Sequence, residues 1–146
     1  MRIRNSLLAL ALVGVAPHDL AAQASDADLR RTVADYVGLY RRETLDRWRA
    51  LFLPGFTAAY TTAEGGVRER TLDEFFAAQR RYLATGRAIR EELENVRVER
   101  SGRIASVWAD FVLTDEGERS RGRLVLLLAD DGGAWKIHSL MFSYDR

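Results

Sequence analysis

The chain has 146 residues, of which 47% are hydrophobic and 29% are charged. This length and composition are typical of one globular domain. The formal net charge of +1 lacks the basic excess that binding to a nucleic-acid backbone requires, so we expect no nucleic-acid partner. The chain contains no cysteine, which excludes disulfide bonds and thiolate sites.

The first 24 residues have the pattern of a secretory signal peptide. Arg2 and Arg4 precede an apolar run over residues 7–16, and Ala22-Gln-Ala24 follows as a small-x-small cleavage sequence. Because the run is about half the roughly 20 residues of a membrane-spanning helix, a permanent anchor is disfavoured. We expect cleavage after Ala24, export to the periplasm or the medium, and no membrane attachment afterwards. The mature domain, residues 25–146, then has zero net charge, because two arginines and one aspartate are removed.

Capping and turn signals divide the next part of the chain into three helices and one hairpin. Ser25 with Asp28, and Thr71 with Glu74, are pairs that start helices. Pro54 ends a short helix between them, and a glycine turn then joins two short strands. The sequence thus predicts helices over residues 25–40, 44–53 and 71–85 and a hairpin over residues 56–70.

Three glycine turns divide the last third of the chain into long antiparallel strands. They are Ser101-Gly102, Glu116-Gly117 and Asp131-Gly132, and such short loops determine which residues of neighbouring strands share a face. One face is almost wholly apolar, so we expect the helices to pack on it. The other is more apolar than a solvated face needs, so we expect a homodimer interface through Trp108, Val125, Leu127, His138, Leu140 and Phe142.

Four stretches of the mature chain carry a family resemblance. They are the apolar stripe of the first helix, Trp48-x-x-Leu51-Phe52-x-Pro54-x-Phe56, Gly132-Gly-Ala-Trp-Lys-Ile137, and Phe142-Ser143. Together they resemble the nuclear transport factor 2-like superfamily, which includes SnoaL-like and ketosteroid-isomerase-like proteins. The resemblance implies an α+β fold in which three N-terminal helices pack on a strongly curved antiparallel sheet. Such a cystatin-like cone has an inner apolar pocket, and these proteins often dimerise through the outer sheet face.

Several side chains are expected to line this pocket and to contact a small apolar or aromatic ligand. Tyrosines at helical spacing are also common core residues, so their position alone does not identify a binding site. Gln79 is more informative, because an amide within an apolar helix face is costly to bury unless something bonds to it. The predicted ligand-binding residues are Tyr40, Trp48, Tyr60, Gln79, Ser139 and Met141.

Enzymes of this superfamily often place a carboxylate base inside the cone, and Glu94 is the candidate here. Continuing the strand register places Glu92 and Glu94 on the inner face. A bulge near Asn95 would instead return Leu93 to the core and turn both carboxylates outward, and this arrangement is favoured. The position of the base therefore depends on the strand register near Asn95.

Other chemistry has little support in the sequence. His138 is the only histidine of the mature domain, and we expect it at the surface or the interface rather than in a metal site. Asp110 lies opposite Arg123, which favours a cross-strand ion pair over a second base. The chain has neither a glycine-rich phosphate loop nor a dinucleotide fingerprint, so no cofactor is expected.

Three functions remain open from the sequence. The first is an exported domain that binds a small apolar or aromatic molecule. The alternative is a ketosteroid-isomerase- or SnoaL-like isomerase, dehydratase or cyclase with a carboxylate base and a tyrosine or Gln79 as hydrogen-bond donor. The third is a structural or protein-interaction module, which a cavity smaller than roughly 300 Å³ would favour.

Overall fold

The two long helices begin where their capping pairs predict. The computed structural model describes residues 24–145, so most of the expected signal peptide lies outside the described residues. Helix α1 (Asp26–Gly38) follows Ser25, and helix α3 (Leu72–Leu83) follows Thr71. At each start the cap hydroxyl accepts a hydrogen bond from the N–H of the third helical residue, whose carboxylate accepts one from the cap N–H. A short turn η1 (Arg42–Thr44) and helix α2 (Leu45–Arg49) lie between them along the chain.

Six strands form one mixed sheet. They are β1 (Phe52–Thr61), β2 (Val67–Thr71), β3 (Ile89–Ser101), β4 (Ile104–Asp115), β5 (Glu118–Asp131) and β6 (Ala134–Tyr144). Their order in the sheet is β2-β1-β6-β5-β4-β3. All neighbours are antiparallel except β1 and β6, which are parallel, so the expectation of a wholly antiparallel sheet is wrong at this one pair. Short turns force the hairpin strands to be antiparallel, whereas β1 and β6 are far apart in sequence and carry no such constraint.

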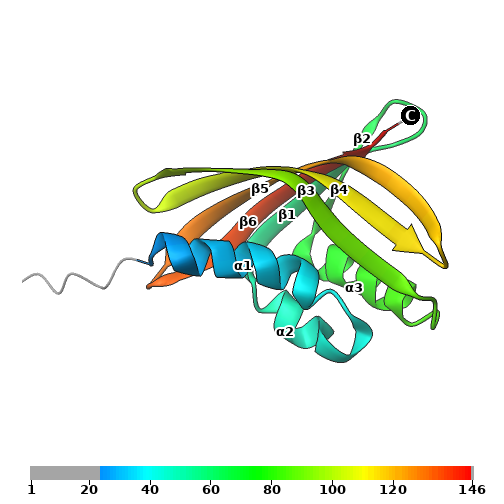
Figure 1. Ribbon diagram of the computed structural model, residues 1–146, viewed down its shortest axis with the longest axis horizontal. Coiled ribbons are helices and arrows are strands. Elements are labelled where there is room, and N and C mark those ends of the chain that lie inside the picture. Colours follow the sequence, from blue (N-terminus) through cyan, green and yellow to red (C-terminus); the bar gives the residue numbers. More distant parts are fainter. Residues whose placement is uncertain (1–23, 146) are drawn as a thin grey trace, which may run out of the picture.

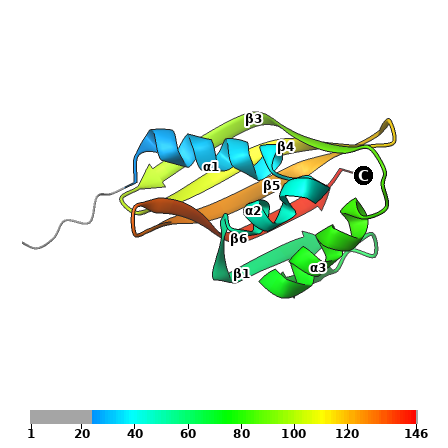
Figure 2. The ribbon, with the colours of Figure 1, turned by 90° about the horizontal axis from the view of Figure 1, so that it is seen from below.

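The helices cover one face of this sheet, as Figures 1 and 2 show. Helix α3 contacts β1 and β2, while α1 contacts β6 and β3. Between the layers lies an aromatic cluster in which the ring centroids of Trp48 and Phe52, and of Phe52 and Phe56, are each 4.7 Å apart. The indole N–H of Trp48 donates to the backbone carbonyl of Tyr36 over 2.7 Å, which holds α2 against α1.

A bulge in β3 decides which of its residues face the helices. The register with β4 shifts between Glu94 and Arg97, and Asn95 has the positive φ of 53°. Leu93 then pairs with Phe111 on the inner face, while Glu94 pairs with Asp110 on the outer face. The bulge expected near Asn95 is therefore confirmed.

A second bulge, in β6, was not predicted. Leu128 pairs with Ile137 but Leu127 pairs with Ser139, so β6 carries one extra residue at His138. One extra residue reverses the facing of everything after it, because side chains alternate along a strand. Leu140 and Phe142 therefore point inward, opposite Leu126 and Leu124 on β5.

This reversal corrects two sets of expected positions. Ser139 and Met141, expected in the pocket, lie on the outer face, where Met141 is 47% exposed. Leu140 and Phe142, expected at a dimer interface, lie on the inner side, and Leu140 is buried. The other residues expected at the interface keep their outer position: Trp108 is 55% and Leu127 47% exposed, Val125 is half-buried and His138 is exposed.

Candidate functional site

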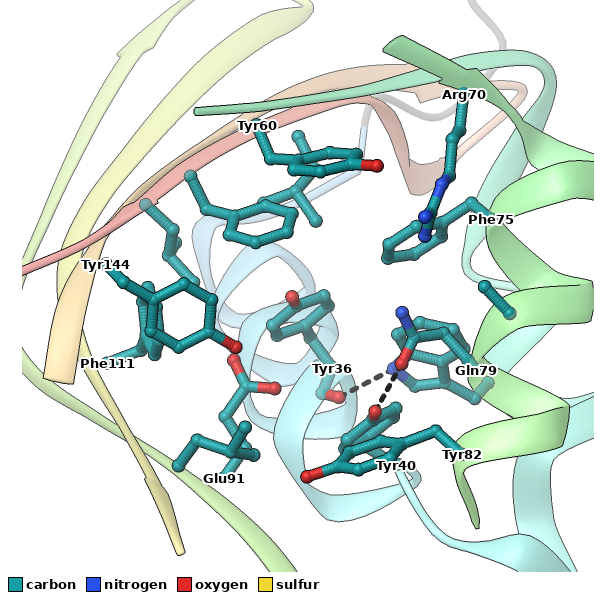
Figure 3. Close-up of a pocket in the computed structure, with 16 residues that line it drawn as sticks. Tyr36, Tyr40, Tyr60, Arg70, Phe75, Gln79, Tyr82, Glu91, Phe111 and Tyr144 are labelled. Atoms are coloured by element: carbon teal, nitrogen blue, oxygen red, sulfur yellow. Dashed lines mark hydrogen bonds between the residues drawn. The ribbon is translucent and has the colours of Figure 1, made fainter. Parts of the chain in front are cut away.

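A cavity of about 440 Å³ lies between the helices and the inner face of the sheet. Its walls come from α1, α2, α3 and Tyr40 on one side. On the other side, each of the six strands contributes at least one residue (Figure 3). Nine of the sixteen lining residues are aromatic, and five of these are tyrosines that bring hydroxyl groups to the wall. The residues that line it are Tyr36, Tyr40, Trp48, Tyr60, Arg70, Phe75, Ala78, Gln79, Tyr82, Glu91, Phe111, Leu113, Leu124, Leu140, Phe142 and Tyr144.

Four of the six residues expected to contact a ligand are in this wall. Tyr40, Trp48, Tyr60 and Gln79 all line the cavity, whereas Ser139 and Met141 do not, because of the bulge in β6. Ligand contact itself stays a prediction for the four. The bulge brings Leu140, Phe142 and Tyr144 into the wall in place of the two that are lost.

Gln79 is half-buried and has a hydrogen-bond partner for one end of its amide. Its Oε1 atom accepts a hydrogen bond from the hydroxyl of Tyr40 (Figure 3). Burial raises the pKa of the Tyr40 hydroxyl, and the nearby Glu91 carboxylate raises it further, so Tyr40 keeps its proton. The bond orients the Gln79 side chain with its amide nitrogen toward the cavity, and no described residue accepts a hydrogen bond from that nitrogen.

Glu91 is the carboxylate that faces the cavity. It pairs with Leu113 across β3 and β4 on the inner face, two residues before Leu93. Neither a hydrogen bond nor an ion pair joins its carboxylate to any residue in the described range 24–145. Figure 3 shows the carboxylate beside the hydroxyl of Tyr144, with the ring of Tyr36 as the next labelled group toward Gln79. Because burial disfavours the charged form, the pKa of Glu91 rises from 4.5 to about 7.

Glu94 does not occupy the position expected for a base. Its side chain is 43% exposed on the outer face, where it forms an ion pair with Arg121 at 3.1 Å. The bulge at Asn95 turns it away from the cavity, as the favoured sequence alternative foresaw for Glu92 and Glu94. Glu91 was not among the predicted site residues, although returning Leu93 to the core also turns Glu91 inward by strand alternation.

Tyrosine hydroxyls near Glu91 are neutral donors. Burial raises the pKa of Tyr36 well above its usual value. Burial also raises the pKa of Tyr144, and the negative charge of the nearby Glu91 carboxylate adds to this effect. The Tyr36 hydroxyl has no hydrogen-bond partner among the described residues, so it is available to a molecule in the cavity. A carboxyl group and tyrosine hydroxyls therefore share one largely aromatic site.

Arg70 brings the only cation into the described cavity wall. It extends from β2, and its guanidinium carbon lies 4.9 Å from the centroid of the Tyr60 ring. The Tyr60 ring in turn stacks on Phe142, with 5.5 Å between centroids and 16° between planes. Figure 3 shows Arg70 and Glu91 on opposite sides of the cavity.

Gly122 makes room for the aromatic wall. A Cβ atom at this position would lie 2.2 Å from the Ser143 carbonyl oxygen and 2.5 Å from the Phe111 ring. Phe111 lies edge-on to Tyr144, with 5.1 Å between ring centroids. Only glycine lets these rings pack at the end of the cavity, and no motif around Gly122 indicates this role.

The other polar residues considered from the sequence lie outside the cavity. Asp110 forms the expected ion pair with Arg123 at 3.4 Å and also accepts a hydrogen bond from Asn95 over 2.7 Å. In the described part of the chain, no three His, Cys, Asp or Glu side chains are grouped to hold a metal ion. The helices of residues 24–145 are all too short or too polar to cross a membrane.

Replacing Glu91 with glutamine should change how stability depends on pH. The raised pKa means that the folded state binds the Glu91 proton more tightly than the unfolded chain does. This group therefore favours folding most below pH 4.5, and its contribution falls by up to about 3 kcal/mol as the pH rises to 7. In denaturant unfolding, Glu91→Gln should gain stability relative to wild type between pH 5 and pH 8.

Glu94→Gln is the matched control for this experiment. It removes a carboxylate of the same strand from the outer face, so its stability relative to wild type should change little over the same pH range. Equal pH profiles for Glu91→Gln and wild type would contradict a desolvated carboxyl in the cavity.

Comparison with known proteins agrees with this architecture. Residues 29–145 match the sequence profile of the SnoaL-like domain. A search of curated proteins found no match. Among solved structures, a protein from Streptomyces avermitilis, provisionally named a dehydratase of the nuclear transport factor 2-like family, superposes with a TM-score of 0.68 at 14% identity. That alignment covers 82% of this chain and 95% of the other.

Two further structures of unknown function share the fold. A cystatin-like protein from Nostoc punctiforme has a TM-score of 0.65 at 13% identity, covering 85% of this chain and 96% of its own. A nuclear transport factor 2-like protein from Pseudomonas aeruginosa has a TM-score of 0.63 at 19% identity, covering 82% of this chain and 97% of its own. At these identities the structures show the fold alone, whereas the profile match spans nearly the whole described chain. The chain belongs to the SnoaL-like family.

Proposed function

We propose that this protein binds a small apolar or aromatic molecule in the cavity between its helices and sheet. The observation that carries the proposal is the cavity itself: about 440 Å³, within the range of roughly 300–1,000 Å³ typical of ligand sites. Aromatic and aliphatic walls favour an apolar body, and a few placed polar groups give it an orientation. A structural module would be expected to fill this space with its own side chains.

Filling the cavity should abolish binding. Ala78 lines the cavity from α3, whereas its neighbour Ala77 is exposed. Ala78→Phe should therefore occupy the ligand volume, and Ala77→Phe adds the same ring outside it. With N-phenyl-1-naphthylamine as a neutral fluorescent probe, wild type and Ala77→Phe should enhance its emission with similar affinity, and Ala78→Phe at least tenfold more weakly. Equal binding by both variants would contradict the proposed site.

A second candidate function is acid–base catalysis, and the unpaired carboxyl of Glu91 is the observation that favours it. A general base works best when its pKa is near the working pH, and burial brings the pKa of Glu91 to about 7. Glu91 would take a proton from a carbon next to a carbonyl group or from a hydroxyl. Tyr36 or Tyr144 would then donate a hydrogen bond to the oxygen on which negative charge develops. The provisional dehydratase name of the Streptomyces avermitilis relative is consistent with such chemistry.

Proton exchange tests this candidate without knowledge of the natural substrate. Exchange of the α-hydrogens of 2-tetralone with heavy water, followed by NMR, should be accelerated by wild type. Glu91→Gln should lose roughly 100-fold or more of that acceleration, and Glu94→Gln should keep it. Equal acceleration by wild type and Glu91→Gln would remove Glu91 as the base. If wild type does not accelerate the exchange, acid–base catalysis on ketones of this class is contradicted, and the binding function alone stays proposed.

We also propose that the protein forms a homodimer through the outer face of the sheet. Trp108, Val125 and Met141 are cross-strand neighbours on β4, β5 and β6, and Leu127 extends this apolar patch along β5. Met141 takes the place that Leu140 and Phe142 were expected to fill. An exposed patch of this kind is typical of an interface.

Charge placed in this patch should separate the subunits. In sedimentation, wild type should run as a dimer and Leu127→Glu as a monomer, because a carboxylate in an apolar interface lacks a partner. Met141→Gln, a polar but uncharged change at the same face, should weaken the dimer less. A Leu127→Glu dimer, or a monomeric wild type, would contradict this interface.

Export is the remaining part of the proposal, and it rests on the signal-peptide pattern. Ala24, the residue before the expected cleavage point, is part of the folded domain. It is buried, and its N–H donates a hydrogen bond to Oδ2 of Asp130 over 3.1 Å. Burial alone would raise the pKa of Asp130, but hydrogen bonds from Ala24 and Gly133 outweigh it and hold the pKa below its usual value. Cleavage after Ala24 would remove one of these donors. N-terminal sequencing of the exported protein locates the cleavage.

A further inference from the structure

Resting on the proposed binding function, we propose that the ligand is a carboxylic acid with an aromatic or alicyclic body. Its carboxylate binds Arg70 and Gln79 at one side of the cavity, and its body extends over the aromatic wall toward Glu91. The acid subsite is built by two elements, β2 and α3, that meet at this side of the cavity (Figure 3).

Arg70 has a charge that no carboxylate neutralises within the described structure. Nine of the eighteen arginines among residues 24–145 form ion pairs with carboxylates, and Arg70 is not one of the nine, although it is the one arginine of the described chain that lines the cavity. Glu74, four residues along, is engaged by the backbone N–H and hydroxyl of Thr71. A guanidinium held in a cavity wall without a carboxylate favours an anion from outside.

One aromatic contact positions the guanidinium of Arg70. The guanidinium makes a cation–π contact with the Tyr60 ring, and this ring is stacked on Phe142. A cation preorganised in this way loses little side-chain entropy when an anion binds. The stacked rings continue away from Arg70 as a surface on which a planar ligand body can lie.

Gln79 supplies a second donor to the same subsite. Because its Oε1 atom accepts the hydrogen bond from Tyr40, the amide group is oriented with its nitrogen free. Figure 3 shows this nitrogen on the Arg70 side of the cavity. A carboxylate between them would accept hydrogen bonds from both side chains, which explains why an amide lies in the apolar stripe of α3.

The position of Glu91 determines the direction of the ligand. Its carboxylate lies on the opposite wall, where it would repel a second carboxylate and accept a hydrogen bond from a hydroxyl or an acidic C–H. The acid group is therefore directed to Arg70, and the part of the ligand that carries a proton is directed to Glu91.

A charge-matched ligand pair tests this inference at pH 8 by titration calorimetry. Wild type should bind 2-naphthoate at least roughly tenfold more tightly than 2-naphthamide, since a hydrogen bond to a charged group contributes more than a neutral one. Arg70→Gln should abolish the preference. Arg68→Gln, the same change at an exposed position of β2 outside the cavity wall, should keep it.

The outcomes separate this inference from the function on which it rests. Equal affinity of wild type for the two compounds, or an unchanged preference in Arg70→Gln, would overturn the acid subsite and leave cavity binding intact. Binding of N-phenyl-1-naphthylamine without binding of 2-naphthoate would also overturn it. Failure of all three probes to bind would overturn the proposed function, and the acid subsite with it.

Discussion

Alternation of side chains along a strand is the constraint on which this site depends, and two bulges set its phase. One extra residue near Asn95 directs Glu91 and Leu93 inward and Glu94 outward. Another at His138 directs Leu140 and Phe142 inward and Met141 outward. Without either bulge the same sequence would line the cavity with a different set of groups. The chemistry of the site is thus decided by backbone irregularities that lie some residues away from it.

The cavity combines an aromatic wall with two charged groups that the protein does not pair with each other. Leaving a carboxyl without a hydrogen-bond donor in an apolar site opposes folding, as the raised pKa of Glu91 shows. Such groups cluster at functional sites, because a molecule that enters can satisfy them. A filled structural core gives no reason for this arrangement, whereas a binding or catalytic site does.

Much of the fold could be predicted from the sequence because its signals are local. The capping pairs at Ser25 and Thr71 and the glycine turns of the hairpins all determine structure within a few residues. The β3 bulge could be anticipated, since Leu93 would otherwise be exposed. The β6 bulge was not predicted, although the apolar positions change phase there, from Trp135 and Ile137 to Leu140 and Phe142. The parallel pairing of β1 with β6 could not be predicted, because only the packed sheet reveals it.

The most direct test of this account is the titration of the Glu91 carboxyl itself, followed by carbon-13 NMR of labelled glutamate and assigned with Glu91→Gln. We expect an apparent pKa of about 7 for Glu91, far from the ordinary value of 4.5. Titration near 4.5 would mean that the carboxyl is solvated, and it would contradict both its desolvation in the aromatic cavity and the proposed base.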